Sequence, residues 1–266
     1  MYSTEAKGLN NAKSILSKVP EITVFFWIIK ILTTGMGEVT SDFLANHMNP
    51  VIAVAIAGVG LAAALLLQFS VRKYVAWIYW LTVIMVSIFG TMAADVLHVG
   101  LGIPYMASTI FFVAALAVVF GVWYASEKTL SIHSVYTFKR EIFYWATILT
   151  TFALGTAAGD MTASTMHLGY FYSGILFAVL IAIPAVAYLI LGLNEIFTFW
   201  FAYIITRPLG ACFADWIGVP KSRGGLGIGT GWVSLTLTIV ILCLVYYMAV
   251  TGKDVKNNIN PNKDAA

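Results

Sequence analysis

Apolar residues fill long stretches of this chain, and short polar segments separate them. A helix needs about 20 predominantly apolar residues to cross the hydrocarbon core of a bilayer. Stretches of this kind lie at 22–44, 51–71, 74–96, 105–124, 142–160, 170–193, 196–216 and 228–250. The pattern therefore predicts an all-α integral membrane protein with eight transmembrane helices.

The polar segments divide the chain into parts. Residues 1–20 lack the apolar stretch and the small-residue cleavage site of a signal peptide, so we expect them to stay on the protein as a cytoplasmic N-terminal segment. The longest break, 126–140, is expected to be a cytoplasmic linker between two four-helix halves, 21–125 and 141–251. Residues 252–266 form a polar tail, which we also expect in the cytoplasm.

Charged residues are few, and their positions give the helices an orientation. Of the 266 residues, 60% are hydrophobic and 10% are charged, against about 25% charged in soluble domains, so a separate soluble domain is excluded. Most lysines and arginines lie in loops on the same side of the membrane as the two termini, whereas Lys221 and Arg223 lie on the other side. By the positive-inside rule, the side with the termini faces the cytoplasm. Lys30 lies within a span and is expected to snorkel toward the cytoplasmic interface. The net charge of +3 is modest, and we expect no nucleic-acid partner.

A motif recurs in the first, third, fifth and seventh spans, with a tryptophan, a glycine and an aspartate spaced as W-x9-G-x4-D. Its copies are Trp27, Gly37 and Asp42; Trp80, Gly90 and Asp95; Trp145, Gly155 and Asp160; and Trp200, Gly210 and Asp215. Successive aspartates are 53, 65 and 55 residues apart, and each interval contains two predicted crossings. The spacing predicts four parallel two-helix repeats.

The spacing also predicts the depth of the aspartates. The 15 residues from tryptophan to aspartate span about 22 Å of helix, less than the ~30 Å hydrocarbon core. With the tryptophans in the inner interfacial belt, the aspartates lie in the outer leaflet and face the bundle interior. The position four residues earlier lies about 40° away around the helix, which places Glu38, Thr91 and Thr156 beside the aspartates. The glycines permit close helix approach or an unwound turn.

Carboxylates at membrane depth are costly unless they are paired, hydrated or bound to a cation. We therefore predict that the primary cation or proton site consists of Asp42, Asp95, Asp160 and Asp215. Glu38 is predicted as an auxiliary carboxylate, and His98, one turn beyond Asp95, as a further metal ligand. Auxiliary positions are Thr91, Thr156, His47, His167 and Arg207, the last as a charge that neutralises Glu38 or an aspartate when no metal is bound. The alternative is that the aspartates only cap helix ends at the surface.

The predicted ligands indicate the kind of cation. Oxygen ligands suit Mg²⁺, Ca²⁺ and Mn²⁺, imidazole adds a preference for later transition metals, and thioethers suit Cu(I). Six of the nine methionines lie near the outer helix ends. Manganese fits this mixture best, and copper and zinc stay open. We expect a divalent metal ion as substrate, no tightly bound cofactor and no catalytic residue; protons as a second substrate and a homo-oligomer stay open.

Three segments are similar to a known family, namely residues 18–44 (KVPEITVFFWIIKILTTGMGEVTSDFL), 152–163 (FALGTAAGDMTA) and 199–220 (FWFAYIITRPLGACFADWIGVP). In these segments the chain resembles uncharacterised bacterial multispanning "membrane-anchored" proteins. The resemblance implies a bacterial inner (plasma) membrane location and an association with manganese homeostasis. We therefore predict a divalent-cation transporter that exports manganese. The alternatives are a copper- or zinc-handling membrane protein, a proton-coupled transporter of an organic solute, and an intramembrane enzyme with paired carboxylates.

Overall fold

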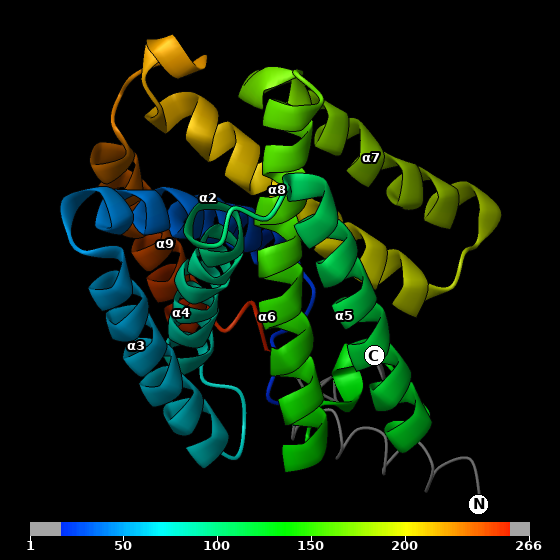
Figure 1. Ribbon diagram of the computed structural model, residues 1–266. Helices are drawn as coiled ribbons and strands as arrows, with labels where there is room; N and C mark the ends of the chain where they lie inside the picture. The colour runs from blue at the N-terminus through cyan, green and yellow to red at the C-terminus, as the bar shows by residue number, and fades with distance from the viewer. Residues whose placement is uncertain (1–16, 256–266) are drawn as a thin grey trace, which may run out of the picture.

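The computed structural model describes residues 17–255, which fold into α-helices and short helical turns without a strand. The α-helices are α2 (Val24–His47), α3 (Pro50–Ser70), α4 (Ala76–Asp95), α5 (Tyr105–Glu127), α6 (Phe138–Asp160), α7 (Gly169–Leu191), α8 (Glu195–Gly218) and α9 (Thr230–Thr251) (Figure 1). The short turns are η1 (Val96–Gly100), η2 (Ile132–Ser134), η3 (Met161–Thr165) and η4 (Lys221–Arg223). Each predicted span overlaps one α-helix. Residues 1–16 and 256–266, from the expected N-terminal segment and tail, lie outside the described residues.

The helices identify a multi-pass membrane protein. Within the described residues, seven helices are long and apolar enough to cross a bilayer, namely α3 to α9. Helix α2 has 24 residues and is as long as the others, but it carries Lys30, Glu38 and Asp42. These three charged residues belong to the interior of the fold described below.

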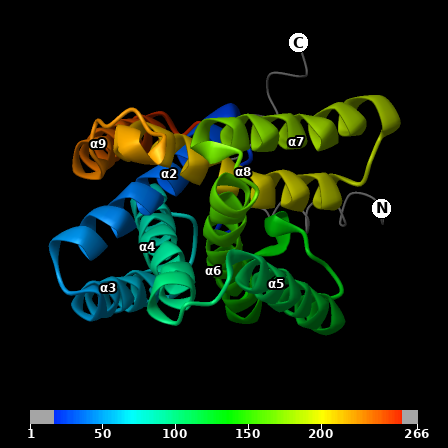
Figure 2. The same ribbon diagram turned by 45° about the horizontal axis from the view of Figure 1, so that its top comes forward.

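Helices α2, α4, α6 and α8 form an inner ring. Each packs against two neighbours, in the order α2, α4, α6, α8 and back to α2. Figure 2 shows these four helices in the middle of the molecule, with α3, α5, α7 and α9 at the periphery. The ring therefore brings together the four helices that carry the tryptophan–glycine–aspartate motif.

The outer helices follow the same cyclic order with an offset of one repeat. Helix α3 packs mainly on α4, α5 on α6, α7 on α8, and α9 on α2. An outer helix thus covers the inner helix of the next repeat, and α9 closes the circle. Because each repeat buries its apolar surface against a neighbour, the four repeats form one packed unit. The outer helices have mean hydropathies of 2.0 to 2.5, against 1.3 for α6 and 1.4 for α8, as expected for a lipid-facing layer around a more polar ring.

The four motif glycines allow the inner helices to approach closely. A Cβ atom on any of them would overlap the neighbouring inner helix, at the pairs Gly37–Ser87, Gly90–Phe152, Gly155–Arg207 and Gly210–Thr34. In each pair the contacted residue lies three positions before the motif glycine of its own helix. All four glycines lie inside regular α-helix, so close approach is confirmed and the unwound turn is not observed.

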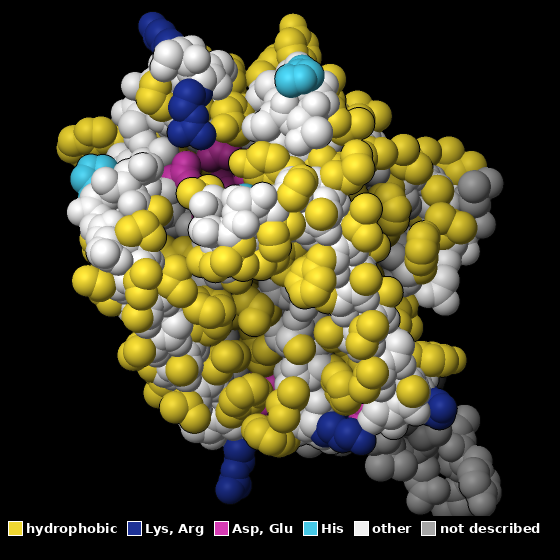
Figure 3. Space-filling view, in the orientation of Figure 1, with side chains coloured by type: hydrophobic (Ala, Val, Ile, Leu, Met, Phe, Trp, Pro, Cys, Tyr) yellow, Lys and Arg dark blue, Asp and Glu magenta, His cyan; other side chains and the backbone are white. Residues whose placement is uncertain are grey.

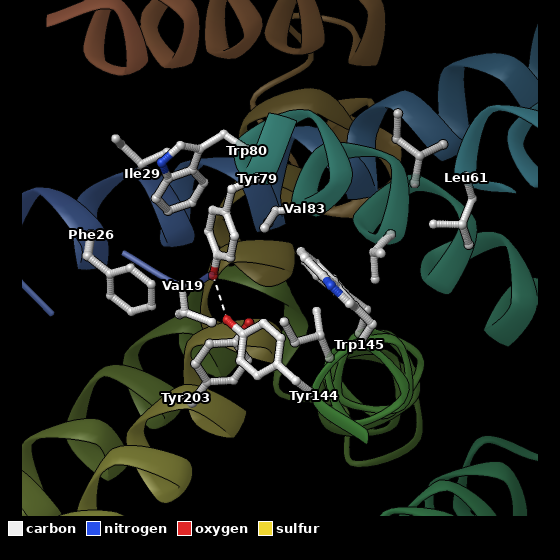
Figure 4. Packing of buried hydrophobic residues seen from close by; sticks show 14 of the residues in the cluster. Val19, Phe26, Ile29, Leu61, Tyr79, Trp80, Val83, Tyr144, Trp145 and Tyr203 are labelled. Carbon is white, nitrogen blue, oxygen red and sulfur yellow. Dashed lines mark hydrogen bonds between the residues drawn. The ribbon is translucent and has the colours of Figure 1, made fainter. Parts of the chain in front are cut away.

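The end of the ring that carries the described chain ends is closed by aromatic side chains. Tyr79 and Tyr144 are buried, and their hydroxyl oxygens lie 2.6 Å apart (Figure 4). Tyr203 and Val19 lie beside this pair, and Val19 belongs to the segment that precedes α2. Lys18, Val19 and Pro20 are all buried although the segment is not helical. The ring axis is therefore filled at this end.

Several contacts fix the segment before α2. Lys18 Nζ lies 2.6 Å from Glu141 Oε2 on α6, and Gln68 donates a 2.9 Å hydrogen bond to the other carboxylate oxygen. The backbone N–H of Lys18 donates to the Val135 carbonyl, which lies in the expected linker. The linker packs against the helices: Val135 is buried, and the Trp200 indole donates a 2.8 Å hydrogen bond to the Leu130 carbonyl.

Candidate cation site

Five carboxyl groups gather inside the ring at the end away from the described chain ends. They are Glu38 and Asp42 from α2, Asp95 from α4, Asp160 from α6 and Asp215 from α8; we call them the acidic cluster. Every pair among the five is close enough for the charged groups to repel each other. The four aspartates and Glu38 therefore lie in one region of the ring, although no three of them converge as ligands of one metal ion within residues 17–255.

Glu38 lies deepest in the acidic cluster and reaches across the ring. Its side chain is buried, and its Oε2 atom accepts hydrogen bonds from Thr156 at 2.8 Å and from Thr91 at 3.2 Å. The two hydroxyl oxygens are also within 3.2 Å of each other. Thr91, Thr156 and Glu38 occupy equivalent positions of three repeats, four residues before the aspartate, and the ring brings these positions together.

The aspartates differ in their surroundings. Asp42, Asp95 and Asp160 are half-buried, and Asp95 accepts a 3.2 Å hydrogen bond from Ser41. Asp215 is buried, and its Oδ1 atom has no hydrogen-bond partner within residues 17–255. A buried acceptor without a partner needs a ligand or water to compensate for its desolvation. Asp215 therefore marks a position where a donor or a cation is expected.

The aspartates are not surface caps. Asp42 and Asp215 lie within their helices, and the chain continues from Asp95 and Asp160 into the π-helical turns η1 and η3. Such π-turns often occur at functional sites, where they re-aim side chains. In the described chain, only the second and third repeats contain a π-turn after the aspartate. The four repeats therefore differ in backbone conformation at the acidic cluster.

Salt bridges do not compensate the acidic cluster. In the part of the chain that the structure describes, the ion pairs join Lys18 to Glu141, and Lys139 and Arg140 to Glu127. All lie at the opposite end of the bundle. Within the described residues, the direct polar contacts of the acidic cluster come from the hydroxyl groups of Ser41, Thr91 and Thr156.

A cleft opens from Asp42 of the acidic cluster to the surface. It has a volume of about 550 Å³ and is lined by Asp42, Asn46 and His47 of α2 and by the segment between α8 and α9, including Lys221 and Arg223. Figure 3 shows acidic side chains inside a hollow at this end, with basic side chains at its edge. Water and small solutes therefore have access to Asp42 from this end.

The histidines do not join the carboxylates in a ligand set. The His98 ring packs on Tyr105, with centroids 4.3 Å apart, and its Nδ1 atom lies 3.2 Å from the Ser108 hydroxyl. His47 is exposed and stacks on Phe43, and His167 is also exposed. Among residues 17–255, no three His, Cys, Asp or Glu side chains converge as ligands of one metal ion. The predicted pairing of His98 with Asp95 around one ion is therefore not present in this conformation.

Two expectations about basic residues are wrong. Lys30 does not snorkel to the interface: it is 1% exposed, donates a 2.7 Å hydrogen bond to the Tyr203 carbonyl and also contacts the Thr206 hydroxyl. Arg207 does not pair with Glu38 or an aspartate. Instead it donates to the Thr34 hydroxyl at 2.9 Å and to the Tyr203 hydroxyl at 2.8 Å.

Lys30 and Arg207 instead form a layer of buried basic side chains between the acidic cluster and the tyrosines. Lys30 Nζ lies 3.3 Å from the centre of the Tyr203 ring, and the Arg207 guanidinium lies 3.3 Å from that of Phe152. Aromatic faces and neutral oxygens surround both side chains, and an aromatic face attracts a cationic group that lies over it. Sequence spacing could not reveal this, since the partners come from other helices.

The chain was also compared with known proteins. It matches the family described as Repeat of Unknown Function (DUF347) in four places, at residues 25–74, 78–129, 143–192 and 198–254. Each match covers one inner and one outer helix and begins two residues before a motif tryptophan, so the four internal repeats are confirmed. No curated protein and no solved structure matches the chain. Because the four matches together cover most of the sequence, the protein belongs to the DUF347 repeat family.

Proposed function

We propose that this protein transports a divalent metal cation, with manganese as the preferred cargo. The observation that supports this most directly is the acidic cluster. Five carboxyl groups from all four repeats lie close enough to repel one another, and one of them, Asp42, lines an accessible cleft. No basic residue forms an ion pair with them in the described chain. A cation would relieve their repulsion, which is why carboxylates at membrane depth are read as a functional site.

The donor atoms favour a hard cation. The groups that contact Glu38 and Asp95 are hydroxyls, and the carboxylates add further oxygens. Such ligands suit Mn²⁺, Mg²⁺ and Ca²⁺ better than Cu(I) or Zn²⁺. Because no three acidic side chains converge on one point in residues 17–255, a cation that keeps part of its water shell fits the arrangement best.

The placement in the membrane is part of the proposal. We include α2 as the eighth span because it packs between α4 and α8 in the inner ring. The positive-inside rule then places both termini in the cytoplasm and the cleft on the outside. The family resemblance of residues 18–44 supports a bacterial inner membrane location and export as the direction.

The ring supports a carrier rather than an open channel. Past Glu38, a cation moving along the ring axis meets the charges of Arg207 and Lys30 and then the Tyr79–Tyr144 pair. Passage therefore requires a second conformation in which the acidic cluster opens to the other end. Transporters built from repeats commonly switch access in this way around a site near the repeat interface.

A proton-coupled transporter of an organic solute is the second candidate. The cleft volume of about 550 Å³ lies within the range of small-molecule sites, and it is larger than a metal ion needs. Lys221, Arg223 and Asp42 on its wall could bind a solute with both charges. Flux measurements with Mn²⁺ distinguish this candidate from the first.

The test is Mn²⁺ flux into proteoliposomes that contain the purified full-length protein. Asp42→Asn, Asp95→Asn, Asp160→Asn and Asp215→Asn each keep the side-chain shape and remove the charge, so each should reduce the flux strongly at normal protein yield. Asp254→Asn is the matched control, because Asp254 lies at the opposite end and accepts a hydrogen bond from Tyr74. Near-normal flux in three or four of the first set would contradict the proposal.

A further inference from the structure

Arg223 stands at the edge of the cleft, in a turn that glycines shape. It ends η4, and the next residue, Gly224, has a φ of 85°, a conformation that glycine adopts without strain. The following backbone folds back on the end of α8: Leu226 donates to the Trp216 carbonyl at 2.7 Å, and Gly227 to the Val219 carbonyl at 2.9 Å. The loop is thus held by its own backbone, and it presents Arg223 at a fixed place.

The Arg223 guanidinium faces the acidic cluster without an ion pair. It donates a 3.3 Å hydrogen bond to the Tyr170 hydroxyl on α7, and Asp42 lines the same cleft. The neighbouring Tyr170 oxygen, followed by the carboxylates of Asp42 and Asp215, raises the pKa of Arg223, so the side chain keeps its charge. Asp160 is also within its electrostatic range. Three of the four aspartates thus share one exposed cation from the loop.

We propose that Arg223 is a tethered counter-cation of the acidic cluster, which competes with the cargo for the carboxylates and so sets the affinity of the site. The inference rests on the proposed cation transport and deepens it. A charge fixed to the loop stabilises the aspartates when the cargo is absent. It also weakens binding of a mobile cation, because the two positive charges repel each other.

Lys221 provides a matched comparison. It lies two residues away in the same turn, lines the same cleft and has the same charge, but the structure gives it no polar contact with Tyr170 or a carboxylate in the described residues. If only the overall surface charge mattered, removal of either charge would change cation binding to the same extent. If Arg223 is a specific counter-cation, only its removal changes cation binding.

The experiment measures Mn²⁺ binding to the purified full-length protein in detergent, by the loss of the free-ion EPR signal. Arg223→Gln should lower the Kd about fivefold at low salt, from the loss of one nearby like charge. Arg223→Lys should bind like the wild type because it keeps the charge, and Lys221→Gln should change the Kd little. The gain in Arg223→Gln should shrink at high salt, since screening weakens charge interactions across an open cleft.

The possible results separate this inference from the proposed function. If the wild type binds Mn²⁺ and Arg223→Gln binds it equally well, the counter-cation is wrong and cation transport stands. Weaker binding in Arg223→Gln would also overturn the inference and would favour a cargo with an anionic group. If the wild type and all variants fail to bind Mn²⁺, both proposals are overturned.

Discussion

Thr156 donates a 2.8 Å hydrogen bond to Glu38, although their helices, α6 and α2, are not neighbours in the inner ring. The bond crosses the ring axis and joins the third repeat to the first. Thr91 of the second repeat donates to the same carboxylate oxygen. Glu38 therefore lies near the ring axis, where side chains of three repeats meet.

Glu38→Gln should keep the fold and lose most of the transport. Glutamine retains an oxygen that accepts from both threonines, but it removes a central negative charge, so we expect Mn²⁺ flux to fall about tenfold or more. Flux in proteoliposomes at matched protein content measures this. Glu127→Gln is the control, because Glu127 pairs with Arg140 at the far end. Equal flux in both variants would show that Glu38 is only structural.

Gly155→Ala should destabilise the protein, because a Cβ at this position would overlap the Cβ atom of Arg207 on the neighbouring helix. Overpacking of this kind costs about 1–3 kcal/mol, which lowers Tm by roughly 3–10 °C. The control is Gly121→Ala in α5, where the new methyl group would meet no atom within 4 Å. This variant should unfold at the wild-type Tm or slightly above it, since alanine favours helix. Equal thermal stability of the two variants would mean that the inner helices are not packed as tightly as described.

The spans and the internal repeat could be predicted from the sequence because both depend on local pattern. The apolar stretches correspond to the helices, and the four tryptophan–glycine–aspartate copies correspond to the inner ring. The placement of Glu38, Thr91 and Thr156 on the same helix faces as their aspartates also followed, since a residue four positions earlier lies on the same face. That the three meet one another depends on how the ring closes.

Contacts between distant helices could not be predicted in this way. Helical spacing predicts the side of its own helix on which Lys30 or Arg207 lies. Their partners, Tyr203 and Phe152, depend on which helices pack together. The one-repeat offset of the outer helices is a property of the closed ring and has no local signal. In the sequence, Arg223 indicates only the membrane orientation, and the glycines that follow it are the local signal for a shaped turn at this place.

The buried ion pair between Lys18 and Glu141 should stabilise the closed end of the ring. Glu141→Gln leaves the Lys18 ammonium buried without its counter-charge, which should cost about 3 kcal/mol. The double variant Lys18→Met/Glu141→Leu removes both charges and should be more stable than either Lys18→Met or Glu141→Leu alone. Thermal unfolding of the purified variants measures the coupling. Losses that simply add would show that the two charges do not depend on each other.

Mn²⁺ binding should weaken as the pH falls. A protonated carboxylate has lost the charge and the electron pair that a cation needs, so protons and metal ions compete for the acidic cluster. For each proton that the metal displaces, Kd should rise by about tenfold per pH unit on lowering the pH through the range where that group titrates. Binding measured at several pH values gives this slope, and Asp215→Asn should flatten it because one competing group is gone. A Kd that does not change with pH in the wild type would mean that the carboxylates of the acidic cluster do not bind the metal, and transport would then need another site.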